Sequence, residues 1–303
     1  MPTDASPTLR ADRMSLAVTA IVVTVAALSL GDALVKLTSN AFGLWQIFLC
    51  RSAIVLPVLV GYLATRPGGL SLRRDGLGWI ALRCLMLVAM WVLYYLSLPH
   101  LTLSVAAAGY YTLPIFITLF SALFLGERIS GRGWLAVVAG FAGVLLVLRP
   151  EAGQINPFAL LPLGSAMLYA GAMIVTRSKC REVEPVVLAA SLNVGFVLTG
   201  AIGLLAVSAF AASDGTFLTM GWIWPEGTGW ITLLVMALSI LIGNVGNAIA
   251  YQNGRPSVIG SFDFAYVGFA VLWGMLFFGD IPDALTTLGI GTIVAAGVLA
   301  LRS

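Results

Sequence analysis

Charged residues are scarce in this chain. Of its 303 residues, 16 are Lys or Arg and 13 are Asp or Glu, so that 10% are charged and 60% are hydrophobic. An ordinary soluble domain carries roughly 25% charged residues. Together with a mean hydropathy of +1.01, this composition indicates a membrane protein embedded in a lipid bilayer. The formal net charge of +3 gives no reason to expect a nucleic-acid partner.

Residues and motifs typical of catalytic centres are also scarce. The chain has one His and three Cys, and the wide, odd spacing of the cysteines favours free thiols over a disulfide framework. It contains no G-x-x-x-x-G-K-[ST] loop, no H-E-x-x-H and no G-x-S-x-G. We therefore expect no metal, no cofactor, no ATP-driven pump and no enzyme, with an intramembrane enzyme as a remote alternative.

Long apolar segments make up most of what is present. Most of them approach the ~20 residues that a helix needs to cross a bilayer. The predicted spans are 14–37, 43–64, 77–97, 101–124, 134–149, 157–176, 185–209, 229–251, 257–279 and 284–301. The first span keeps Asp32 and Lys36 and is followed by no small-residue cleavage site, so we interpret it as a retained helix. The fold class is therefore predicted as an all-α membrane protein with ten transmembrane helices.

Basic residues fall on one side when the connections are numbered alternately. Only Arg149 lies in a segment assigned to the outside. The inside segments hold Arg10, Arg13, Arg66, Arg73, Arg74, Arg128, Arg132, Arg177, Lys179, Arg181, Arg255 and Arg302. Because Lys and Arg are enriched in cytoplasmic connections, this pattern predicts that both termini are cytoplasmic. An even number of spans agrees with that prediction.

The end of the first half of the chain resembles the end of the second. Residues 123–149 and 276–302 both run from an apolar span, through a Gly followed by an acid, into a short span that ends near an Arg. Gly126 and Gly279 are the matching glycines. Each motif closes a block of five spans, and because five is odd the second block enters the membrane from the opposite side.

This repetition predicts two inverted five-helix repeats, 14–149 and 157–302, that form one transport unit. Inverted repeats recur in secondary transporters, where two exchangeable halves give alternating access to a site near the bilayer midplane. The small-molecule substrate and the lipid bilayer are the expected partners. The sequence leaves both a monomer and a homodimer open.

A family resemblance extends over nearly the whole chain. Residues 106–129 run from small residues through Pro114 and an apolar stretch to Gly126-Glu127-Arg128, and residues 262–282 form a similar second copy. In these motifs the chain resembles the drug/metabolite transporter superfamily, in its EamA-type ten-helix branch, and is similar to bacterial exporters of amino acids and other metabolites.

The resemblance implies a secondary transporter. It would export small metabolites, with amino acids (aromatic ones included) foremost, across the bacterial inner membrane by alternating access. The alternative is an importer of a vitamin or nucleoside-like metabolite, of the riboflavin or S-adenosylmethionine type, because residues 262–282 also resemble that subgroup.

Four charged residues in or near the first three spans need a reason, since an ionisable side chain costs about 2.5–3.5 kcal/mol at the centre of a membrane helix. Asp32 and Lys36 are one turn apart and can form a salt bridge, or act in gating or substrate binding. Arg51 and Arg83 could clamp a substrate carboxylate with two donors. They could equally reach the interface, satisfy helix carbonyls or, for Arg51, pair with Asp32.

Asp263 is the sharpest candidate for a functional charge. It lies about two turns into the ninth predicted span, between Phe262 and Phe264. A carboxylate at this depth could bind a substrate ammonium or take up and release a proton during transport. The alternative is a structural partner for Arg83 or Arg255.

Aromatic and amide side chains within the spans complete the candidate cavity. Amides inside a membrane either join helices or line a polar cavity, and paired tyrosines beside a proline form a plausible cavity wall. The candidates are Trp91, Tyr94, Tyr110, Tyr111, Tyr169, Asn244 and Asn247. Pro114 removes a backbone hydrogen bond and is predicted to kink the fourth helix.

Overall fold

The computed structural model describes residues 13–38, 41–65, 76–97, 100, 109–148, 157–210, 216–279 and 281–302, without the side chains at positions 36, 148, 210, 278 and 301. In these ranges the regular structure is helical. The helices are α1 (Met14–Thr38), α2 (Leu44–Thr65), α3 (Leu77–Ser97), α5 (Leu113–Leu125), α6 (Gly131–Leu148), the short η2 (Pro157–Ala159), α7 (Leu160–Ser178), α8 (Pro185–Phe210), α9 (Thr228–Asn253), α10 (Pro256–Asp263), α11 (Ala265–Phe278) and α12 (Ala284–Leu301).

Most of these helices suit a bilayer. Among the described residues, seven helical segments are long and apolar enough to cross a membrane, with α10 and α11 together counted as one. Three shorter apolar helices lie at 113–125, 131–147 and 284–300. Large apolar side chains such as Leu123, Phe124 and Leu205 are exposed on the outside of the bundle, as lipid-facing residues are. The chain is therefore a multi-pass membrane protein.

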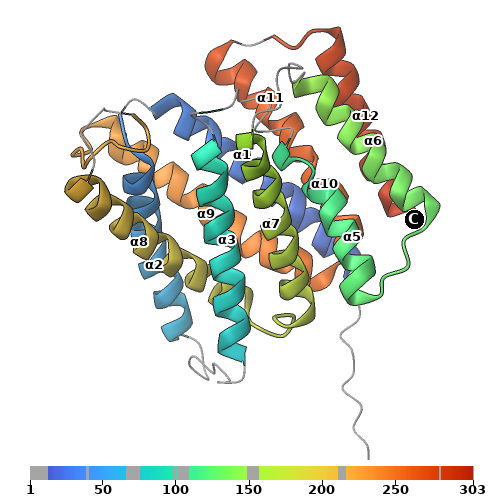
Figure 1. Ribbon diagram of the computed structural model, residues 1–303, viewed down its shortest axis with the longest axis horizontal. Helices are drawn as coiled ribbons and strands as arrows, with labels where there is room; N and C mark the ends of the chain where they lie inside the picture. The colour runs from blue at the N-terminus through green and yellow to red at the C-terminus, as the bar shows by residue number, and fades with distance from the viewer. Residues whose placement is uncertain are drawn as a thin grey trace, which may run out of the picture.

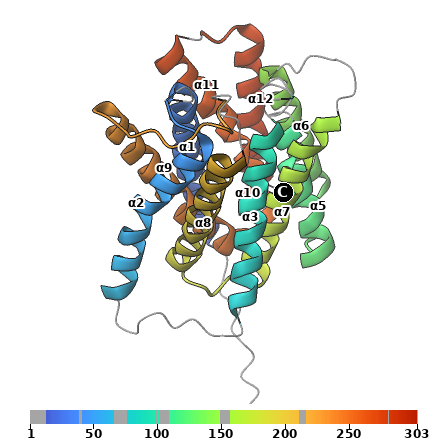
Figure 2. The same ribbon diagram turned by 60° about the vertical axis from the view of Figure 1, so that its left-hand side comes forward.

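The helices pack in pairs around a common centre. Helices α6 and α12 lie together along one side, and α2 and α8 lie together on the other (Figure 1). Between these pairs, α1 packs on α9 and α3 packs on α7. Turning the molecule shows α3 and α7 adjacent again, and α6 beside α12 (Figure 2). The largest apolar cluster lies at the centre and includes Phe48, Phe196 and Tyr251.

The ninth span is interrupted, which differs from the continuous helix expected over 257–279. Helix α10 ends at Asp263 and α11 begins at Ala265. Phe264 between them keeps right-handed helical angles (φ −59°, ψ −25°), so the interruption is a local gap in the backbone hydrogen bonding and not a reversal of the chain. Polar backbone groups freed inside a membrane need partners from the protein or from a water-filled cavity.

The fourth span is interrupted as well. Residues 109 and 110 are helical, Tyr111 and Thr112 form a turn, and α5 begins at Leu113. Pro114 lies in the first turn of α5, where a missing N–H leaves no helical bond unmade. The predicted helix over 101–124 thus begins anew at Leu113, and its first part, 101–108, lies outside the described residues.

Both Gly-acid turns end a helix in the same way. Gly126 closes α5 with φ 67°, and Gly279 closes α11 with φ 71°. This left-handed conformation is readily adopted by Gly, because a side chain at Cβ would clash with the backbone. The second residue of the second turn, Asp280, lies outside the described residues.

Candidate functional site

One large cavity lies at the centre of the bundle. Its volume is about 910 Å³, which is enough for a metabolite of moderate size. Its walls come from α1, α3, the 109–113 segment, α7, α9, α10 and α11. Leu192 of α8, one residue near an end of each of α6 and α12, and the α8–α9 and α11–α12 connections complete them. The cavity therefore borders on both helix interruptions.

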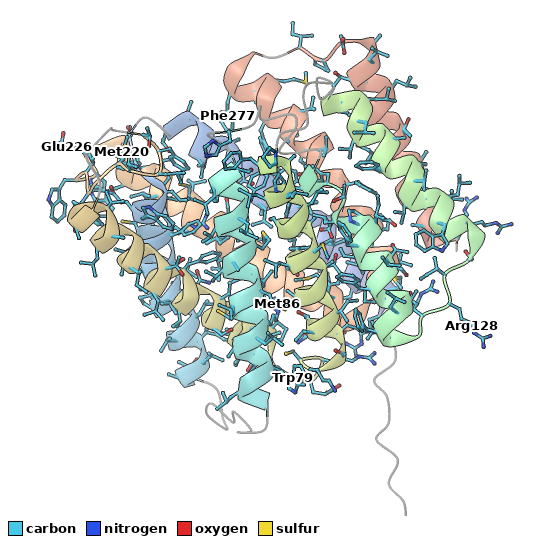
Figure 3. All side chains as sticks on the ribbon, viewed as in Figure 1. Trp79, Met86, Arg128, Met220, Glu226 and Phe277 are labelled. Carbon is cyan, nitrogen blue, oxygen red and sulfur yellow. The ribbon has the colours of Figure 1, made fainter. Side chains whose placement is uncertain are left out.

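The cavity reaches one end of the molecule. Thr216, Phe217 and Leu218 of the α8–α9 connection and Ile281 and Pro282 of the α11–α12 connection line it. We call this the upper end. Figure 3 shows Met220, Glu226 and Phe277 at the upper end, whereas Trp79 and Arg128 lie at the opposite, lower end.

The predicted site residues gather at this cavity. Arg83 and Asp32, for which pairing, gating and substrate binding were all left open, line it as well. So do all eight residues proposed for the cavity wall: Trp91, Tyr94, Tyr110, Tyr111, Tyr169, Asn244, Asn247 and Asp263. Arg51 does not line the cavity; its guanidinium lies 4.9 Å from the ring centroid of Phe48 and 5.1 Å from that of Phe196. The side chain of Lys36 lies outside the described residues.

Asp263 is held by two tyrosine hydroxyls in the lower part of the cavity. Tyr251 donates a hydrogen bond to Oδ2, and the Tyr169 hydroxyl lies 3.5 Å from Oδ1. The Nδ2 atom of Asn247 donates to the Tyr169 hydroxyl over 2.7 Å. These contacts join α7 to the consecutive helices α9 and α10, so residues of two other helices position the carboxylate of α10. In the described part of the chain its hydrogen-bond partners are hydroxyls and not Arg83.

The carboxylate of Asp32 is the second one in the cavity wall and lies nearer the upper end. It is half-buried and accepts a hydrogen bond from the hydroxyl of Tyr266 in the first turn of α11. One turn earlier on α1, Ser29 Oγ accepts from the indole Nε1 of Trp273 over 3.0 Å. Helices α1 and α11 are therefore tied together along the wall of the cavity.

A layer of tyrosine rings lies between the two carboxylates. The ring centroid of Tyr110 is 5.2 Å from that of Tyr94, 5.7 Å from that of Tyr111 and 6.4 Å from that of Tyr169. The Tyr110–Tyr111 and Tyr110–Tyr169 pairs meet edge to face, at 71° and 70°. Such contacts fix ring positions and leave π faces for a ligand.

Several polar atoms near the cavity lack a partner. Arg83 is 1% exposed, and its Nε donates to Thr176 Oγ1 over 2.7 Å while Nη1 has no hydrogen-bond partner. Nδ2 of Asn244 and Oδ1 of Asn247 are also unpartnered. A buried polar group without a partner costs about 1–3 kcal/mol, so a site that supplies one through a ligand gains stability on binding. Within the described ranges, no three His, Cys, Asp or Glu side chains gather to hold a metal ion.

The lower end is closed by bonds around the last turn of α9. The amide of Gln252 donates to the carbonyls of Cys180 (2.6 Å) and Val183 (2.7 Å) in the α7–α8 turn. The Gln252 carbonyl accepts from Arg177 Nη1 (2.9 Å) and Arg181 Nε (3.3 Å). We call this set of contacts the lower latch.

Two further contacts extend the closure across the lower end. The backbone N–H of Arg13 donates to the Asn253 carbonyl over 2.9 Å, which holds the start of α1 against the end of α9. Glu127, just after α5, accepts hydrogen bonds from Ser121 and from Ser257 at the start of α10. The lower ends of five helices are thereby connected.

At the upper end the α8–α9 connection is fastened to α2. The Leu44 N–H donates to the Phe217 carbonyl, and Trp45 Nε1 donates to the Leu218 carbonyl, both over 2.9 Å. The Gln46 side chain bonds both backbone groups of Ile223. These contacts hold a short stretch of backbone over the side of the cavity without sealing it.

Three important residues were missed from the sequence: Tyr95 and Tyr266, which line the cavity, and Tyr251, which is buried beside it. Tyr95 lines the cavity and stacks on Trp91 at 5.4 Å, although its sequence position suggests a membrane interface. Tyr251 and Tyr266 bond the two carboxylates. A signal existed for both, since Tyr251 is one turn after Asn247 and Tyr266 is three residues after Asp263, on the same helix faces as candidates already chosen.

Comparisons with known proteins agree on a transporter. The profile of the EamA-like transporter family matches residues 15–149. The pseudopaline exporter of Pseudomonas aeruginosa is 27% identical over 274 residues, which cover 90% of this chain and 91% of the exporter. A riboflavin transporter of Rhizobium johnstonii is 30% identical over 236 residues, which cover 78% of this chain and 74% of that protein.

A solved structure supports the fold. A crystal structure with 19% sequence identity superposes with a TM-score of 0.79 and covers 95% of this chain and 97% of its own. At this identity the likeness concerns the fold alone.

Proposed function

The chain belongs to the EamA-like transporter family of the drug/metabolite transporter superfamily, and on that premise we propose that it is a secondary carrier that exports small metabolites across the bacterial inner membrane by alternating access. Amino acids, aromatic ones included, are the foremost substrates of this proposal. Its relatives are named both as an exporter and as riboflavin transporters, so export of amino acids is part of this proposal and follows the family resemblance of the sequence motifs.

The observation that carries the proposal is a cavity built at two interrupted helices. The same sequence separation relates three pairs of positions in the two halves: the turn glycines Gly126 and Gly279, and two pairs at the helix interruptions. Those pairs are Tyr110 with Asp263 and Tyr111 with Phe264. The two interruptions therefore occupy corresponding positions relative to the two Gly-acid turns. Discontinuous helices at corresponding positions of two halves mark the substrate site in many secondary transporters, because their freed backbone groups and side chains face the ligand.

Helix pairing supports two inverted repeats, 14–149 and 157–302. If the first five membrane helices correspond in order to the second five, the α1–α9 contact corresponds to the α3–α7 contact, and the α1–α11 contact to the α5–α7 contact. Exchanging the two halves leaves the α2–α8 pair and the α6–α12 pair unchanged, because each pair joins two corresponding helices. Arg128, next to the first Gly-acid turn, and Phe277, next to the second, lie at opposite ends of the molecule (Figure 3).

The distribution of charge supports a cytoplasmic lower end. Figure 3 shows Arg128 at that end together with Trp79 of α3. Arg177 in the last turn of α7 and Arg181 just after it bond the end of α9 there, and Arg255 follows α9. With the lower latch closed and the cavity lined by upper connections, the conformation corresponds to an outward-facing state of an alternating-access cycle. Export then requires the latch to open toward the cytoplasm to admit substrate.

Transport by purified protein in proteoliposomes tests the proposal. Labelled phenylalanine and leucine are loaded at the lower-end side and their flux is followed with and without an imposed pH gradient. We expect flux above empty liposomes that unlabelled amino acids of either side-chain type inhibit. Absence of flux from protein of normal thermal stability would contradict the proposal.

An importer of a vitamin-like metabolite is the second candidate function. The 30% identical relative named as a riboflavin transporter favours it, and so does a cavity of about 910 Å³ walled by aromatic rings, which has room for a flat heterocycle. The same proteoliposomes distinguish the candidates. Riboflavin flux without amino-acid flux would replace the first proposal by the second.

A further inference from the structure

We propose that the lower part of the cavity is an ammonium site, so that the carrier recognises its substrate by a cationic amine and also transports amines that lack a carboxylate. The proposal rests on the carrier function proposed above and specifies which end of the substrate decides recognition. The chemical class is a primary amine on an apolar or aromatic body, which includes decarboxylated amino acids.

The first element of the site is the carboxylate of Asp263. It is 5% exposed, lines the cavity and is hydrogen bonded by neutral hydroxyls from Tyr169 and Tyr251. A buried carboxylate whose partners are neutral is costly to ionise in a region shielded from water. An ammonium group that enters the cavity supplies the missing positive charge together with hydrogen-bond donors.

The second element is the group of tyrosines beside this carboxylate, in which Tyr110 and Tyr169 line the cavity and Tyr251 is fully buried next to them. The centroids of Tyr169 and Tyr251 are 6.4 Å apart at 82°, and those of Tyr110 and Tyr169 are 6.4 Å apart at 70°. The three rings come from two helices and from the interruption of the fourth span. Aromatic faces attract cations through their quadrupole, and rings grouped around one position are the usual means of binding an ammonium.

The third element is a hydrogen-bond acceptor without a partner, on the residue that bonds Tyr169. Asn247 uses Nδ2 to donate to Tyr169, which leaves Oδ1 without a partner although the residue is only 7% exposed. An ammonium carries three donors and no acceptor. The carboxylate of Asp263 and the Oδ1 of Asn247 accept two of these donors, and the π faces cover the remaining side.

A substrate carboxylate finds only deeply buried donors in the same cavity. Arg83 is 1% exposed with its Nε held by Thr176, and Arg51 is 4% exposed, stacked on Phe48 and Phe196, and outside the cavity lining. The unpartnered donors that belong to residues of the cavity lining are Nη1 of Arg83 and the neutral Nδ2 of Asn244, and both atoms are buried. Arg83 is less exposed than Asp263, at 1% against 5%, and one of its donors is already used by Thr176, so the amine contributes more discrimination than the carboxylate.

Three ligands that share one phenyl ring and differ only in their charged groups test the proposal. They are phenylalanine, phenethylamine and 3-phenylpropionate, used as competitors and as labelled substrates with the wild-type protein in proteoliposomes. We expect phenethylamine to compete within about tenfold of phenylalanine, and 3-phenylpropionate to compete at least about 100-fold more weakly, in line with the strength of one charged hydrogen bond.

Competition among the three ligands in the wild-type protein tests the ammonium site without any variant. Phenylalanine flux with competition by 3-phenylpropionate but not by phenethylamine overturns the ammonium site and leaves the carrier function intact. Absence of flux for all three overturns both. The variant Asp263→Asn is expected to weaken phenylalanine and phenethylamine alike, by about 10- to 100-fold. Its control Gln46→Leu, whose side chain bonds Ile223 and does not line the cavity, leaves competition by both ligands unchanged. An Asp263→Asn variant that retains the amine preference overturns the proposal.

Discussion

The two ends of the cavity are built differently. At the lower end Asp263 has two hydroxyl partners and lies behind a latch that joins α7, α8 and α9 through Gln252. At the upper end Asp32 is half-buried with one hydroxyl partner, and the connections there line the cavity instead of closing it. This difference suits the lower end, with more contacts around its carboxylate, to selecting a ligand. It suits the upper end, with fewer contacts, to admitting or releasing one.

The largest effect on transport is expected from replacing the two carboxylates, Asp263 and Asp32, one at a time by amides. Asp263→Asn keeps volume and hydrogen-bonding capacity but removes a buried charge that two helices position, so we expect phenylalanine flux to fall about 100-fold. Asp32→Asn acts on a more solvated group and is expected to cost about tenfold or less. Initial rates in proteoliposomes, normalised to folded protein, check both. Equal losses would remove the distinction between the ends.

A second way to sharpen the comparison is to open the lower latch. Gln252→Ala removes two hydrogen bonds to the α7–α8 turn, each contributing about 1 kcal/mol, which favours the open state by roughly 10- to 30-fold. Cys180, fully buried under the latch, reports this opening. Burial raises the pKa of the Cys180 thiol, against an opposing effect of the Arg83 charge, so the closed state is protonated and slow to alkylate near neutral pH.

The measurement is maleimide labelling of Cys180 in a protein with Cys50→Ser and Cys84→Ser. Because opening hydrates the thiol and lowers its pKa toward the ordinary value, we expect labelling of Gln252→Ala to be faster at pH 7 and to rise with pH. Gln46→Ala, at the other end, serves as the control and leaves Cys180 labelling unchanged. Labelling that is equal in Gln252→Ala and wild type would show that the latch does not hold the lower end.

A smaller effect is expected from the bond between α1 and α11. Tyr266→Phe keeps the ring and deletes the hydroxyl that donates to Asp32, so only one hydrogen bond is lost, worth about 1 kcal/mol. We expect a change of about fivefold in turnover and little change in substrate competition. Tyr251→Phe deletes the matching bond at Asp263 and is expected to alter competition as well. Indistinguishable competition profiles for the two variants would count against different roles for the two ends.

The smallest effect is expected at the α8–α9 connection. Gln46→Leu removes the side-chain bonds to Ile223 but keeps the backbone contact of Leu44 with Phe217. We expect a loss of about 1–2 kcal/mol in stability, seen as a lower Tm, and at most a twofold change in transport. A Tm equal to that of the wild type would show that this connection is held by the remaining contacts alone.

Much of the fold and part of the site were accessible from sequence. Apolar runs predicted the helices to within a few residues, as with α8 against 185–209 and α12 against 284–301, because segment length and hydropathy are local properties. The two helix interruptions were not predicted as breaks, since Phe264 and Thr112 are not residue types that strongly break a helix. Pro114 was expected to kink a continuous helix, whereas α5 begins one residue before it.

The candidate site shows the same division. Polar and aromatic residues inside apolar helices were selected because few purposes other than a cavity justify their cost, and all eight selected for the wall line the cavity, while their part in binding stays a prediction. Arg51 was chosen for the same reason but lies against aromatic rings outside the cavity. Depth within a span does not reveal which way a side chain turns.

The sequence by itself determined that the chain is a multi-helix membrane transporter, because composition, span length and family motifs are sums over local residues. Only the tertiary structure decided which hydroxyls meet which carboxylates. Tyr251 reaches Asp263 from another helix, and Tyr266 reaches Asp32 from 234 positions away. Such pairs depend on the rotation and pairing of whole helices, which the packing of the complete bundle sets and no short stretch of sequence contains.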